Sequence, residues 1–89
     1  MFNKIIDNYI KNLNKNDILL FGQNNNIELS NSELNYIYNE IKNNYKILLS
    51  NNYMEVFNKA KDYIDNEKLK KIYNLFINYR LKYNNFLNE

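Results

Sequence analysis

The chain contains no cysteine and no histidine. Disulfides, metal sites built from thiolates or imidazoles, and catalysis by Cys–His or Ser–His pairs are therefore excluded. The N-terminal stretch MFNKIIDNYIKNL mixes charged side chains into its apolar positions, so it predicts neither a signal peptide nor a membrane-spanning helix. Carboxylates are the only conventional catalytic side chains left. We therefore expect a cytoplasmic protein that is not an enzyme, binds no metal or cofactor and does not enter a membrane.

Proline is absent too, whereas asparagine, lysine, isoleucine and tyrosine are abundant, and 22 of the 89 residues are asparagine. These four types have A- and T-rich codons, which favours a genome of low G+C content over a prion-like asparagine tract. An apolar fraction of 45% with 16% aromatic residues is typical of a folded chain. At this length, we expect residues 1–89 to form a single helical domain.

The most regular pattern lies between Ser30 and Leu49, where apolar residues recur every three or four positions. This spacing predicts an amphipathic α-helix whose apolar face must be covered by neighbouring segments. Ser30 and Glu33 have the spacing of a capping box, which defines where the helix begins. We expect this helix to be the centre of the fold.

Four further helices are predicted around this central one from the same spacing. They cover residues 2–13, a short segment capped by Asn14 and ended by Gly22 with the run 23–26 that follows it, a segment capped by Asn52 that runs to Ile64, and a last helix that begins at Asp65. Because the connections are short, we expect an all-α fold, a compact bundle of about five short helices. The predicted core consists of Leu34, Ile37, Ile41, Leu48, Phe57, Ile72 and Phe76.

The predicted second and third helices have the length and turn of a helix-turn-helix motif. Residues 17–42 carry four acidic side chains and one basic side chain, which is the wrong charge for a segment that binds DNA. An ordinary helical hairpin is therefore the preferred interpretation. Glu33 and Glu40 share a helix face, and we interpret them as a solvated stripe, because no base or nucleophile accompanies them.

Basic residues are concentrated late in the chain. Residues 59–82 carry seven basic and three acidic side chains, whereas the first 58 residues have a net charge of −1. Lys68, Lys70 and Lys71 are the candidate anion-binding residues of this segment. They suggest one possible function, weak binding of nucleic acid by the basic C-terminal helices.

The last predicted helix carries more aromatic residues than a single core-facing stripe can use. Tyr73, Tyr79, Tyr83 and Phe86 are the candidate interaction residues, because tyrosine combines apolar area with a polar tip and is common at interfaces. The preferred hypothesis is a non-catalytic protein-interaction module that binds a protein partner or a second copy of itself. Alternatively, the first helix covers this surface through Phe2, Ile6 and Tyr9 and leaves a monomer.

The succession LNKNDILLFGQNNNIELSNSELNYIYNEIKNNY, then VFNKAKDYI and a closing KYNNFL, covers nearly the whole chain. It resembles a YqfT-like family of short proteins of low-G+C Gram-positive bacteria that is known only as a domain of unknown function. The sequence departs from that family at Asn25 or Asn26, where family members tend to carry glycine. It also departs at Asn52 and Tyr53, where a glycine-proline-type break often precedes the fourth helix. The resemblance implies a cytosolic bacterial helical protein and brings no activity, cofactor or site residues.

Overall fold

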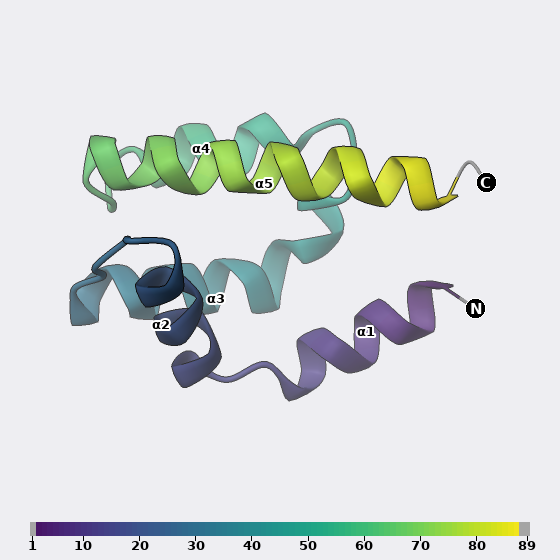
Figure 1. The fold of residues 1–89 in the computed structure, drawn as a ribbon, viewed down its shortest axis with the longest axis horizontal. Coiled ribbons are helices and arrows are strands. Elements are labelled where there is room, and N and C mark those ends of the chain that lie inside the picture. The colour runs from purple at the N-terminus through teal and green to yellow at the C-terminus, as the bar shows by residue number, and fades with distance from the viewer. Residues whose placement is uncertain (1, 88–89) are drawn as a thin grey trace.

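In a computed structural model, the described part of the chain consists of α-helices and turns, without β-strands (Figure 1). The structure describes residues 2–87 and, among them, the side chains of residues 4–82. The helices are α1 (Phe2–Asn12), α2 (Lys15–Asn24), α3 (Asn31–Leu48), α4 (Tyr53–Ala60) and α5 (Asn66–Leu87). The prediction of an all-α bundle of about five helices is confirmed.

The long helix α3 packs against α1, α2 and α4, and α5 packs against α4. Figure 1 shows α4 and α5 side by side and antiparallel, and it shows that α1 begins at the end of the molecule where α5 ends. Within the described residues, α1 lies on α3 and not on α5, so Ile5 and Tyr9 stay 63% and 67% exposed. Ile6 is half-buried, and Phe2 lies outside the described side chains.

Three of the four predicted caps are present. Ser30 and Glu33 form a reciprocal capping box at α3, and Asn14 forms one with Asp17 at α2. Asp65 accepts a hydrogen bond from the backbone N–H of Lys68 at 3.2 Å and so caps α5. The predicted cap at Asn52 is wrong, because its backbone is not extended (φ −94°, ψ 16°) and its side chain makes no capping hydrogen bond.

The helix α2 ends at Asn24, within the stretch 22–26 that was predicted to end it, and the left-handed residue of the following turn is Asn26 (φ 60°), not Gly22. Gly22 is buried inside the helix, where its carbonyl accepts a hydrogen bond from the Ile27 N–H at 2.7 Å. A Cβ at Gly22 would lie only 2.7 Å from the carbonyl oxygen of Ile27. Glycine is needed here because the returning chain lies so close.

The main core lies between α3, α4 and α5. Phe57, Ala60, Ile64 and Leu69 are buried together, although α4 ends at Ala60 and Ile64 reaches the core from the following turn. The predicted core residues Ile37, Leu48, Ile72 and Phe76 are half-buried against this cluster, and Leu34 and Ile41 are also half-buried. Three further residues, Leu13, Ile18 and Ile27, are buried around α2.

This core is thin. No described side chain is less than 2% exposed. Phe57 is the only residue of the predicted core that is buried, and its side chain is still 8% exposed. The helices α1, α2 and α4 are short, and the described part of α1 packs only on α3, so large apolar side chains such as Ile5, Leu20 and Leu81 stay in contact with water.

Candidate interaction site

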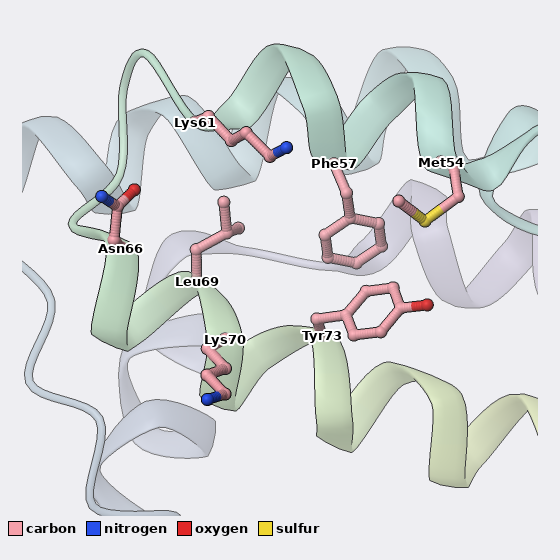
Figure 2. A pocket seen from close by; sticks show the side chains of 7 residues that line it. All are labelled: Met54, Phe57, Lys61, Asn66, Leu69, Lys70 and Tyr73. Atoms are coloured by element: carbon pink, nitrogen blue, oxygen red, sulfur yellow. The ribbon is translucent and has the colours of Figure 1, made fainter.

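An apolar groove runs between α4 and α5, with a volume of about 220 Å³ (Figure 2). Met54, Phe57 and Lys61 line it from α4 and the residue that follows this helix, at spacings that place them on one helix face. The α5 side is formed in the same way by residues three and four positions apart, namely Asn66, Leu69, Lys70 and Tyr73. The groove therefore follows from the antiparallel packing of two helix faces.

Rigid and adaptable side chains are combined in this groove. Phe57 and Leu69 are buried and form its floor, and the rings of Phe57 and Tyr73 meet edge to face with centroids 5.1 Å apart at 89°. Met54 is 42% exposed at one end, beside the Tyr73 ring in Figure 2. Because methionine is flexible and polarizable, Met54 can adjust to the shape of an incoming apolar group.

Both charged residues that line the groove are lysines. Lys61 and Lys70 are exposed and belong to opposite walls, and none of the described lining residues is a carboxylate. Burial, together with the neighbouring Tyr53, raises the pKa of Tyr73. The Tyr73 phenol therefore stays neutral at physiological pH and adds no charge to the groove.

The three lysines predicted to bind anions do not share one surface. Lys70 lines the groove, whereas Lys71 points toward the α2–α3 loop, with its Nζ 3.5 Å from the Asn26 carbonyl oxygen. The Nζ of Lys68 lies 2.9 Å from a carboxylate oxygen of Glu33. The structure therefore separates Lys70 from the other two and pairs Lys68 with an internal carboxylate.

The interpretation of Glu33 as part of a solvated stripe is wrong, because this side chain is only 6% exposed. Burial alone would raise the pKa of Glu33, but the Lys68 ammonium and the backbone N–H groups of Asp65 and Ser30 outweigh it and lower the pKa to about 2. Glu40, the other acid of that stripe, is half-buried and lies 3.4 Å from the Nζ of Lys59. Both acids are structural links between helices.

Of the candidate aromatic residues, the two with described side chains lie in different places. Tyr73 belongs to the α4–α5 groove, whereas Tyr79 lines a separate pocket of about 150 Å³ with Leu48, Leu49, Phe76 and Arg80. Tyr79 is 54% exposed, and its ring centroid lies 6.0 Å from that of Phe21 in α2. Tyr83 and Phe86 lie outside the described side chains. Tyr73 and Tyr79 therefore do not form one tyrosine-rich face.

Sequence reasoning missed Met54, Lys61 and Asn66 as site residues. The spacing of Met54, Phe57 and Lys61 was visible, but it predicted only a helix, with Phe57 in the core. The pattern could not indicate that no described element covers the outer edge of the stripe, because that depends on where the other helices lie.

Within residues 2–87, no group of three or more acidic side chains is arranged to hold a metal ion, and no helix is long and apolar enough to cross a membrane. No protein-family model, curated protein or solved structure matches this chain. Membership of the family that the sequence resembles therefore stays a prediction, and function has to be argued from the site itself.

Proposed function

We propose that this chain is a non-catalytic protein-interaction module that binds an apolar side chain of a partner protein in the α4–α5 groove. The observation that carries this proposal is the groove itself, with a buried floor of Phe57 and Leu69 and a half-exposed methionine at its edge. A preformed apolar groove of this kind favours a partner side chain, because binding removes apolar surface from water without reorganising the backbone.

Exposed apolar side chains support the same function. Large apolar side chains such as Leu20, Met54 and Leu81 are more than two-fifths exposed. Apolar surface of this kind is available to a partner protein.

Nucleic-acid binding, the alternative predicted from the sequence, has less support. Lys68 is paired with Glu33, and Lys70 and Lys71 lie on different sides of α5, so these lysines offer no continuous row of cations to a phosphate backbone. In a helix-turn-helix interpretation α3 would be the recognition helix, yet it packs against three other helices.

Selection from a random peptide library displayed on phage tests the proposed function. The wild-type protein serves as bait, and the Met54→Glu variant serves for counter-selection, because a charge at this exposed edge opposes apolar ligands without entering the buried core. We expect enriched peptides to bind the wild type and to lose at least about tenfold in affinity for the variant.

Backbone amide NMR shifts of the labelled protein then locate the selected peptides. We expect the largest shifts in residues 54–61 and 66–73. Ile47→Glu, at an exposed apolar residue of α3 outside the groove, is the matched control and should leave affinity unchanged. Peptides that bind both variants equally, or an absence of enrichment, would show that the groove is not an interaction site.

A further inference from the structure

We infer that the partner presents an acidic amphipathic helix to the α4–α5 groove, a step that rests on the proposed function and specifies the partner's chemistry. The groove lies between two antiparallel helices and follows their axes (Figure 2). A third helix can pack into such a groove by placing its own side chains between those of the two walls. A β-strand is less suitable, because no described strand offers an edge for it to pair with.

The length of the groove indicates how much of a helix it can hold. On the α4 side it extends from Met54 to Lys61, and on the α5 side from Asn66 to Tyr73. Each of these spans corresponds to about two helical turns, or roughly 10 Å. The volume of about 220 Å³ is enough for a small number of apolar side chains and not for a long lipid tail. The partner helix should therefore present two apolar anchors, one or two turns apart.

The charges around the groove select the polar residues of that helix. Lys61 and Lys70 stand on opposite walls, so glutamates on both sides of the partner's apolar stripe would each meet a lysine. Four carboxylates of this chain adjoin the lining residues in sequence, namely Glu55, Asp62, Asp65 and Glu67, but none of them lines the groove. The local charge that an occupant meets is therefore positive.

Two synthetic helical peptides of about 18 residues test this inference. They share one apolar face of leucines around a single tryptophan and differ only at the positions flanking this face, which are glutamate in one peptide and lysine in the other. Because the protein has no tryptophan, the emission of the peptide reports binding without interference. We expect the acidic peptide to bind about tenfold more tightly than the basic one and to weaken with added salt.

Charge reversal in the protein provides the second arm of the experiment. In the Lys61→Glu/Lys70→Glu variant the preference should invert toward the basic peptide, and circular dichroism should show unchanged helicity, because both lysines are exposed. The control variant Lys4→Glu/Lys46→Glu changes the net charge by the same amount at exposed sites away from the groove. It should keep the preference for the acidic peptide.

The outcomes separate the inference from the proposed function. Equal binding of both peptides, with affinity lost in Met54→Glu, would keep the groove as an interaction site and overturn the choice of an acidic helix. If neither peptide binds, both proposals fail. If vesicles of phosphatidylglycerol or single-stranded DNA bind instead and lose affinity in the charge-reversed variant, the lysines serve another anion and the inference is overturned.

Discussion

A buried glutamate joins two helices in this protein. Glu33 accepts hydrogen bonds from the Ser30 N–H within its own capping box, and it also accepts from the Asp65 N–H at 3.0 Å and from the Lys68 ammonium at 2.9 Å. The same carboxylate therefore caps the start of α3 and holds the start of α5 against it. Because burying a carboxylate is costly, this arrangement depends on all of these donors being present.

We expect Glu33→Gln to destabilise the protein by about 1–3 kcal/mol at neutral pH, since the amide keeps some hydrogen bonds but loses the charge that meets Lys68. Chemical denaturation measures this change. An exposed acid of α4, Glu55, supplies the control, and Glu55→Gln should have little effect.

The pH dependence of stability tests the same carboxylate independently. The folded protein holds the pKa of Glu33 at about 2, below its ordinary value of 4.5, so the folded state favours the ionised form. The stabilisation is therefore complete above about pH 5 and is lost as the pH falls toward 2. We expect the difference in unfolding free energy between wild type and Glu33→Gln to shrink over this range. A difference that stays constant from neutral to acidic pH would contradict the assigned role.

Glycine is required at position 22 because a larger side chain would collide with the backbone of Ile27, and not because of its backbone conformation. In an ordinary helix, alanine is more stable than glycine by about 1 kcal/mol. Here the added Cβ would lie 2.7 Å from a backbone oxygen of Ile27, which cannot move without breaking the turn. We expect Gly22→Ala to lower the unfolding free energy by about 1–3 kcal/mol. Gln23→Ala, next to it and exposed, should be neutral or stabilising, and a stabilised Gly22→Ala would contradict the close approach.

Basic side chains from distant helices satisfy the C-terminal ends of two helices. Lys42 in α3 donates to the carbonyls of Ile10 and Lys11 at the end of α1. Arg80 in α5 donates to the Leu48 carbonyl at 3.1 Å and lies over the Tyr53 ring at 4.7 Å. Because the last carbonyls of a helix have no partner within the helix, these cations complete the hydrogen bonding and also hold the elements together.

Since the described part of α1 packs only on α3, its stability should depend strongly on Lys42. We expect Lys42→Met to increase amide hydrogen exchange in α1 by about three- to tenfold, because a charge-assisted contact is worth about 1 kcal/mol at a partly exposed site. Exchange in α4 and α5 should not change. Lys46→Met, one turn further along α3 and exposed, should leave α1 as it is. Faster exchange in all helices at once would indicate global destabilisation instead.

At the scale of the whole molecule, the fold has few deeply buried side chains and an elongated shape, with extents of 37 × 23 × 23 Å. Phe57 is the centre of the main core, because its ring contacts those of Tyr73 and Phe76 at centroid distances of 5.1 Å each. A small domain with such a core has a small margin of stability, on the order of 5 kcal/mol. A single large cavity can remove most of it.

We therefore expect Phe57→Ala to cost about 3–5 kcal/mol and to leave a margin of only roughly 0–2 kcal/mol at 25 °C, so that the variant unfolds at low denaturant concentration. Circular dichroism with a denaturant titration measures the loss. Met54→Ala, one turn away on the same helix face but 42% exposed, should cost less than about 1 kcal/mol. Similar losses in both variants would mean that the core is not centred on Phe57.

Local interactions were predictable from the amino-acid order. Helix type follows from the spacing of apolar residues, and the caps at Asn14, Ser30 and Asp65 involve partners only three positions apart, which any chain with these residues can form. The cap at Asn52 failed because a turn with Ser50 competes for the same backbone, as the 3.0 Å hydrogen bond from the Asn52 N–H to the Ser50 hydroxyl shows.

Tertiary structure decided the rest, because it depends on contacts between residues that are far apart in the chain. From the sequence alone, Glu33 is interpreted as a surface acid. In the structure, the Nζ of Lys68 in α5, 35 positions away in the chain, lies 2.9 Å from its carboxylate oxygen. Lys68, Lys70 and Lys71 are close in sequence, but the helix places Lys70 on a different side from Lys71. The groove exists only because α3 covers one side of the α4–α5 pair, while the other side stays open within the described residues. Periodicity identifies an apolar stripe, but only the placement of whole helices determines which part of that stripe stays exposed.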